Sequence, residues 1–280
     1  MKVLVIYPYS DKLLNALKEA IELRLGEFIL VGDKSLIIEK CYKNNIRSKE
    51  FVIYDISEDL EVIDFCIDSL KDKTVDYLIF DDFPVLYQNK ILKYEKDRDI
   101  GNVDVLDMPF LRHFLFVSNY SKNHNIDFED KKVSILQAYE LMKKIGLKKT
   151  NVALISNLNS KTDILEANII NMILRDSGIN NINIFDNFNI YNLFLKDSKV
   201  NIYKNNINLL VLRNFEASRI FLDTLNAFTN IKIASFILGK TYAIDAKQIK
   251  DDNNIIFSLI ILNKIHKSQG NINSIKARII

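Results

Sequence analysis

The sequence predicts an α/β protein in which strands and helices alternate around mainly parallel sheets. Continuous apolar runs of strand length, such as residues 3–7, recur along the chain. Such runs are typical of parallel strands that are buried on both faces. Segments with helical spacing of apolar residues separate them, and strands joined by helices of this length imply βαβ crossovers. Hydrophobic residues make up 48% of the 280 residues and charged residues 26%, which indicates a substantial core.

The first half of the chain reads as strand, helix, strand, helix. Ser10 is placed to cap the first helix and Gly26 to end it. Ser57 is placed to cap the third helix, which should run to about residue 70. Residues 81–107 are less regular, and we expect a helix, a loop and an edge hairpin there. The expected strands are 3–7, 28–31, 51–56, 75–80 and 114–117.

From about Asp130 the alternation starts again, with a helix that stops at Gly146. The expected strands that follow are 152–155, 182–185, 209–212 and 231–238. The expected helices are 163–175, 216–228 and 254–266. This restart indicates two α/β domains with a cleft between them, although the periodicity also permits one large sheet.

Composition argues against several classes of protein. The formal net charge is +2, and the 38 basic and 36 acidic residues are spread along the chain. A nucleic-acid binder usually carries a concentrated basic stripe, which is absent from the sequence. No apolar run approaches the roughly 18 residues of a membrane helix, and the first run is too short for a signal peptide. We expect a cytoplasmic protein. Neither the cysteines, Cys41 and Cys66, nor the three histidines have metal-ligand spacing, so no metal is expected.

Two segments after strands have alternative interpretations. Asp81 and Asp82 follow the fourth strand, where acidic residues either face a ligand crevice or lie in a solvated loop. The loop 156–162 contains Asn159, Lys161 and Thr162 and opens a helix. Its amides, hydroxyls and lysine suit an anion, and they equally suit an ordinary N-cap.

One further segment only partly matches a known motif. Residues 239–241 (GKT) resemble the end of a phosphate-binding P-loop, but the glycine required five positions earlier is Ala234.

Several collinear blocks resemble the phosphate acetyltransferase and phosphate butyryltransferase family. The blocks are KEAI at 18–21 with FILVGDK at 28–34, KKVSILQA at 131–138 with NVALIS at 151–156, and LRNFEA at 212–217. Their order and spacing hold over roughly residues 15–262. The resemblance implies an isocitrate/isopropylmalate dehydrogenase-like fold of two α/β/α domains, in which the C-terminal helix returns to the first domain. The domains would then be residues 1–129 plus 250–280, and residues 130–249.

The resemblance also implies a homodimer and the reaction of an acyl-CoA with phosphate to give an acyl phosphate and CoA. The partners would be small molecules, with a CoA thioester as substrate and no bound cofactor. Attack of phosphate on the thioester creates an oxyanion, and the leaving thiolate is anionic, so cationic and N–H donors should converge on the cleft. The ligand-binding residues that we expect are Asn159, Lys161, Thr162, Asn214, Glu216, Lys247 and Lys250.

The sequence departs from the family pattern at motif positions. The Gly-Asn that follows the third block is Ser218-Arg219, and the C-terminal Ser-Arg-x-Asp is replaced within 246–251 (AKQIKD). The Lys-Gly after the fourth strand is Asp81-Asp82. Lysine cannot reproduce the two-pronged grip of arginine on phosphate. No catalytic residue can be assigned, and two hypotheses stand: an acyltransferase with a remodelled site, or an inactive relative that binds a ligand or a partner subunit.

Overall fold

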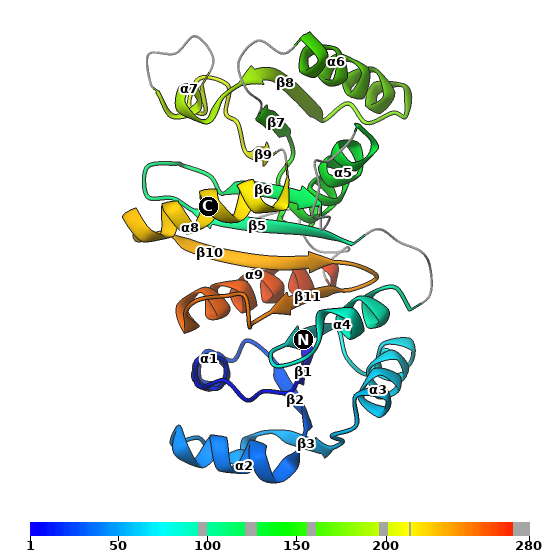
Figure 1. Cartoon of the computed structure of the whole chain (residues 1–280), viewed down its shortest axis with the longest axis vertical. Coiled ribbons are helices and arrows are strands. Elements are labelled where there is room, and N and C mark those ends of the chain that lie inside the picture. Colours follow the sequence, from blue (N-terminus) through cyan, green and yellow to red (C-terminus); the bar gives the residue numbers. More distant parts are fainter. Residues whose placement is uncertain (95–99, 121–127, 156–160, 196–200, 213, 271–280) are drawn as a thin grey trace. The chain divides into compact units, whose positions relative to one another are not determined.

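The computed structural model describes residues 1–94, 100–120, 128–155, 161–195, 201–212 and 214–270. The chain forms two compact units, one of residues 1–100 with 234–280 and one of residues 101–233. Each unit is a mainly parallel sheet with helices on both faces, which confirms the predicted α/β class (Figure 1). Residues 101–120 belong to the second unit, because their two antiparallel strands pair with each other and pack against the helix at 128–145. Residues 234–249 belong to the first unit.

The first unit has the strand order β3-β2-β1-β4-β11-β10. Strands β3, β2, β1, β4 and β11 run parallel, and β10 runs antiparallel to β11. The strands are β1 (Lys2–Ile6), β2 (Glu27–Gly32), β3 (Val52–Asp55), β4 (Tyr77–Phe80), β10 (Lys232–Leu238) and β11 (Tyr242–Asp245). The helices are α1 (Asp11–Glu22), α2 (Lys34–Lys43), the 3-10 turn η1 (Ser48–Glu50), α3 (Asp59–Lys71), α4 (Val85–Leu92) and α9 (Asp252–Gly270).

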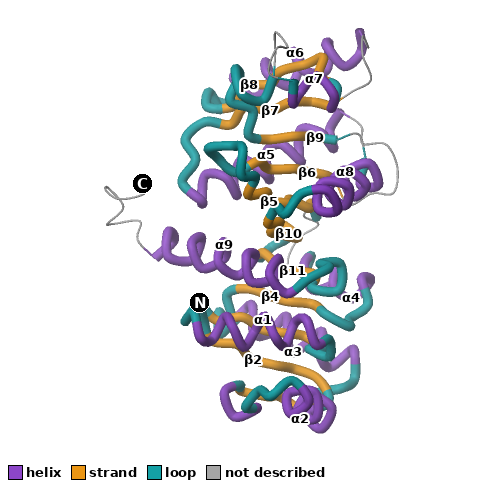
Figure 2. The backbone as a smooth tube through the Cα atoms, turned by 90° about the vertical axis from the view of Figure 1, so that its left-hand side faces the viewer, coloured by secondary structure: helices purple, strands orange, loops and turns teal. Residues whose placement is uncertain are grey.

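Burial explains why these segments form a layered unit. Residues 3–6 of β1 are completely buried, as expected for a central parallel strand. Helix α1 places Leu13 and Leu17 on one buried face, at the predicted helical spacing. Helices α1 and α9 pack together on one face of the sheet, and α3 packs with α4 on the other. In Figure 2, α1 and α9 lie in front of the strands of this unit and α3 lies behind them.

The second unit has the strand order β5-β6-β9-β7-β8. Strand β5 pairs antiparallel with β6, and the other pairs are parallel. The strands are β5 (Gly101–Asp107), β6 (Leu115–Tyr120), β7 (Thr150–Ile155), β8 (Ile182–Phe188) and β9 (Leu209–Val211). The helices are α5 (Phe128–Ile145), α6 (Lys161–Asp176), α7 (Ile190–Phe194) and α8 (Phe215–Phe228). Helices α5 and α6 lie on one side of this sheet and α7 and α8 on the other (Figure 1).

The two predicted serine caps are wrong in detail. Ser10 occupies the N-cap position of α1, but its hydroxyl makes no capping hydrogen bond and donates instead to Asp81 Oδ1 at 2.9 Å. The N-cap of α3 is Glu58 rather than Ser57. At α1 a tertiary hydrogen bond replaces the expected cap, and α3 begins one residue later than the capping pattern predicted.

The segment that resembles a P-loop is a turn between two antiparallel strands. Gly239 to Thr241 connects β10 to β11, a strand that the sequence did not predict. Lys240 N donates to Leu92 O at 3.1 Å, and Thr241 Oγ1 donates to Asp76 O at 2.8 Å. A phosphate loop needs its N–H groups directed at a ligand and a helix directly after it, and neither is present here.

Candidate functional site

The carboxyl ends of three neighbouring strands meet at one edge of the second unit. Strands β6, β9 and β7 are adjacent and parallel, so their last residues lie at the same edge. Helix α8 begins after β9, and helix α6 begins after β7. The first N–H groups of a helix have no partner within the helix, and the helix dipole favours negative charge there. Two helix N-termini on adjacent strands therefore give this edge the character of an anion site.

The start of α8 carries two of the predicted ligand-binding residues. Asn214 is the N-cap, and its Oδ1 accepts a hydrogen bond from Ala217 N at 2.7 Å. Glu216 lies in the first turn and is exposed. A carboxylate in the first turn stabilises the helix, but it also competes with any anionic ligand for the same positive end.

The start of α6 carries two more of these residues. Lys161 and Thr162 are the first two residues of the helix. The backbone topology places them at the strand end next to the one that carries Asn214. Asn159 lies outside the described residues. The structure thus brings four of the predicted residues, from two segments distant in sequence, to one edge of one sheet.

A buried polar group that the sequence did not predict lies behind the start of α8. Asn119, near the end of β6, is completely buried, and its Nδ2 donates to Ser218 Oγ at 2.9 Å. Ser218 is also completely buried, and the neighbouring Arg219 lies 3.9 Å from the buried carboxylate of Asp104 on β5. Ser218 and Arg219 stand where the phosphate acetyltransferase and butyryltransferase pattern, which the sequence resembles, has Gly-Asn. Both fasten α8 to the β5–β6 pair.

The carboxyl edge of the first unit is rich in carboxylates that have structural partners. Asp81 is only 2% exposed, so it is neither a solvated loop residue nor open to a ligand. Its Oδ2 accepts hydrogen bonds from Tyr9 N at 3.0 Å and Ser10 N at 2.7 Å. These bonds hold the β1–α1 connection against the end of β4.

The predicted lysines of the first unit lie after β11, beside these carboxylates. Lys247 Nζ lies 2.8 Å from Asp82 Oδ1, and both side chains are mostly exposed. The hydrogen bond and the charge of Asp82 raise the pKa of Lys247. Lys250 is exposed. Burial raises the pKa of Asp245, against the opposing effect of the hydrogen bonds that it accepts from Gln248 Nε2 and Lys247 N. The cation at Lys247 is therefore already neutralised by a neighbouring carboxylate.

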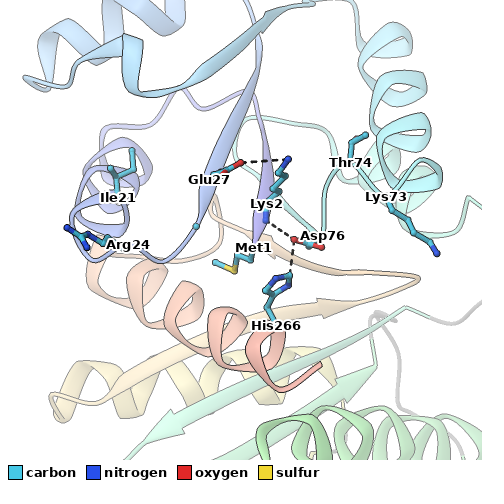
Figure 3. A pocket seen from close by; sticks show the side chains of 10 residues that line it. Met1, Lys2, Ile21, Arg24, Glu27, Lys73, Thr74, Asp76 and His266 are labelled. Atoms are coloured by element: carbon cyan, nitrogen blue, oxygen red, sulfur yellow. Dashed lines mark hydrogen bonds and ion pairs between the residues drawn. The ribbon is translucent and has the colours of Figure 1, made fainter. Parts of the chain in front are cut away.

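An open pocket of about 800 Å³ lies at the opposite, amino edge of the first unit (Figure 3). At its centre, Asp76 Oδ2 accepts a hydrogen bond from Lys2 N at 2.7 Å and lies 3.6 Å from His266 Nδ1. Arg24 and Lys73 lie at its margins and point away from this centre. None of the predicted site residues lines the pocket. Helices α1 and α3 both end at this edge, and helix C-termini disfavour anions.

Among the described residues, no group of three or more His, Cys, Asp or Glu side chains is arranged to hold a metal ion. None of the described helices is long and apolar enough to cross a membrane. Asn119 was missed because it looks ordinary in sequence. The available signal was a polar pair, Ser118-Asn119, at the end of an otherwise apolar strand.

No family model and no curated protein matches the sequence. Solved structures do match it along nearly its whole length. A branched-chain phosphotransacylase from Enterococcus faecalis V583 matches with a TM-score of 0.77 and 14% identity, over 95% of this chain and 99% of that chain. A phosphotransacetylase from Streptococcus pyogenes matches with a TM-score of 0.70 and 11% identity, over 96% and 94%.

Dehydrogenases share the architecture as well. An isocitrate dehydrogenase from Methylococcus capsulatus matches with a TM-score of 0.51 and 14% identity, over 96% of this chain and 86% of that chain. Since one fold serves several chemistries, these likenesses identify the fold and leave the reaction to the site. The chain shares its fold with phosphotransacylases and, more distantly, with dehydrogenases of the isocitrate dehydrogenase type.

Proposed function

We propose that the protein is a phosphate acyltransferase that converts an acyl-CoA and phosphate into an acyl phosphate and CoA, with an acetyl or butyryl group as the acyl class. The observation that carries this proposal is the pair of helix N-termini, α6 and α8, on adjacent strands of a fold that matches phosphotransacylases over nearly the whole chain. Acting as a homodimer in the cytoplasm is part of the same proposal.

The reaction needs few groups from the protein. A phosphate oxygen attacks the thioester carbonyl carbon, the resulting oxyanion collapses, and the C–S bond breaks to release the CoA thiolate. Phosphate would be held by the N–H groups at the starts of α6 and α8. Donors of this kind also stabilise an oxyanion as its charge develops.

A second candidate is a relative that binds a ligand without turnover. One observation favours it, since Lys247 is paired with Asp82 and the neighbouring Asp81 and Asp245 are buried carboxylates. An anionic substrate would be repelled by this edge of the first unit unless the lysine were released from its partner.

The test follows thiol release from acetyl-CoA and butyryl-CoA with purified protein, with and without phosphate. Phosphate-dependent release supports the transferase. No release from a folded sample, with an active phosphotransacetylase as the control, would reject the transferase. Saturable binding of CoA or phosphate in that same sample would then support the second candidate.

A further inference from the structure

We infer that Asn119 is a positioning residue that fixes the N-terminal turn of α8 through Ser218 and thereby sets the affinity of this edge for phosphate. The second half of this inference rests on the proposed function. The first half concerns only the contacts of α8 and stands independently of any substrate.

The contacts form one continuous path from the sheet to the start of the helix. Asn119 Nδ2 donates to Ser218 Oγ at 2.9 Å, and both residues are completely buried. Ser218 N donates to Asn214 O at 3.2 Å, and Asn214 Oδ1 caps the helix by accepting from Ala217 N. The N–H groups at the start of α8 are therefore oriented by a turn that is tied, through Ser218, to the end of β6.

The path depends on a residue at which this chain differs from the family pattern that it resembles. The pattern has glycine where this chain has Ser218, and glycine has no hydroxyl to accept a hydrogen bond from Asn119. The neighbouring Arg219 approaches Asp104 on β5. Consecutive residues of α8 thus attach the helix to β6 and β5.

Asn119 is also incompletely satisfied where it stands. Its Oδ1 is buried and has no hydrogen-bond partner among the described residues. Because an unpartnered buried amide oxygen costs free energy, a polar group kept in this state calls for a specific reason. Holding the start of α8 through the Nδ2 hydrogen bond supplies that reason.

Ser118 provides a matched control on the same strand. It is 1% exposed, and its Oγ donates to Ser134 O at 3.1 Å, which attaches the end of β6 to α5 rather than to α8. Ser118→Ala removes one buried hydrogen bond of similar length from the neighbouring position. Any effect common to Asn119→Ala and Ser118→Ala reflects general loss of packing and hydrogen bonding.

The first measurement is amide hydrogen exchange of residues 216–219 in the folded full-length chain. Asn119→Ala and Ser218→Ala should each speed exchange there by about tenfold, because each deletes the contact that holds the turn. The double variant should exchange no faster than either single variant, since both act on one interaction. Ser118→Ala should leave these amides within about twofold of the wild type.

The second measurement is the dissociation constant for inorganic phosphate, determined by calorimetry on samples shown by urea titration to be folded. Asn119→Ala and Ser218→Ala should each weaken binding by about tenfold, and Ser118→Ala should not. Equal effects of Asn119→Ala and Ser118→Ala on exchange would overturn the positioning role. Faster exchange in Asn119→Ala and Ser218→Ala but not in Ser118→Ala, together with an unchanged affinity for phosphate, would overturn the link between Asn119 and the ligand. A wild-type chain that does not bind phosphate would reject the proposed function and that link together, and exchange would still decide whether Asn119 positions α8.

Discussion

Replacing Asp81 by alanine removes the acceptor of three hydrogen bonds in one buried place. These bonds come from Tyr9 N, Ser10 N and Ser10 Oγ, at 3.0, 2.7 and 2.9 Å. A hydrogen bond to an ionised group contributes about 1.5–3 kcal/mol. Three such bonds at the lower end of this range, less some recovery by entering water, give a loss of about 4 kcal/mol in the free energy of unfolding.

Asparagine at the same position separates geometry from charge. Its amide oxygen can accept from both backbone N–H groups while its NH₂ donates to the Ser10 hydroxyl, so all three hydrogen bonds survive. What is lost is the charge beside the N-terminus of α1, which contributes about 0.3–1 kcal/mol. Asp81→Asn should therefore cost about 1 kcal/mol, roughly a quarter of the loss in Asp81→Ala.

Urea unfolding followed by circular dichroism measures both variants, with Asp82→Asn as the control. Asp82 is the adjacent carboxylate, but it is mostly exposed and makes an ion pair with Lys247. Its replacement should change the free energy of unfolding by less than about 0.5 kcal/mol. A loss below about 1 kcal/mol for Asp81→Ala, or equal losses for the two carboxylates, would refute the reasoning that burial and three donors make Asp81 structural.

Three further predictions address single groups. The native pKa of Asp245 is raised by burial, so the folded chain binds more protons than the unfolded chain between the unfolded value of about 3.9 and the raised native value. The stability that this group contributes should therefore fall as pH rises through that window. The urea midpoint of Asp245→Asn should fall less than that of the wild type between acidic and neutral pH. An equal fall in both chains would exclude Asp245 as the source of the pH dependence. Asn214→Ala removes the N-cap of α8 and should cost about 1 kcal/mol in urea unfolding, whereas a neutral result would show that the cap hydrogen bond contributes little. Lys247→Ala should shift the free energy of unfolding by less than about 0.5 kcal/mol, since both partners of its ion pair are mostly exposed, and a larger loss by the same titration would contradict that account.

Most of the secondary structure could be predicted because it depends on local patterns. The run at 3–7 became β1, and the helix expected after Ser10 became α1, which ends at Glu22 rather than at Gly26. Strand β11 and helix α7 were not predicted from the sequence. Strand β11 forms because it pairs with β4, which is distant in the sequence, and with β10, which directly precedes it. The pairing with β4 comes from the fold and cannot be recognised in the residues of β11.

The candidate site was predictable only in part. The position of Lys161 after a strand marked it as a residue at a sheet edge, because parallel strands end together, whereas Asn214 was expected only from the family resemblance. Sequence could not show that β9 and β7 are neighbours, since strand order does not follow chain order in this sheet. The charge at Lys247 was predicted as free for a ligand, and its partner Asp82 lies 165 residues away in the sequence.

The sequence by itself determined most of the segments that are strands or helices, because apolar periodicity acts over a few residues. Only the tertiary structure decided what the polar side chains do. Ser10 was placed to cap a helix, yet its hydroxyl binds Asp81 because β1 and β4 are neighbours in the sheet. Asn119 finds Ser218 across 99 residues for the same reason, as β6 and β9 lie side by side and α8 follows β9. A buried polar group must find a partner, and the fold decides which partner is within reach.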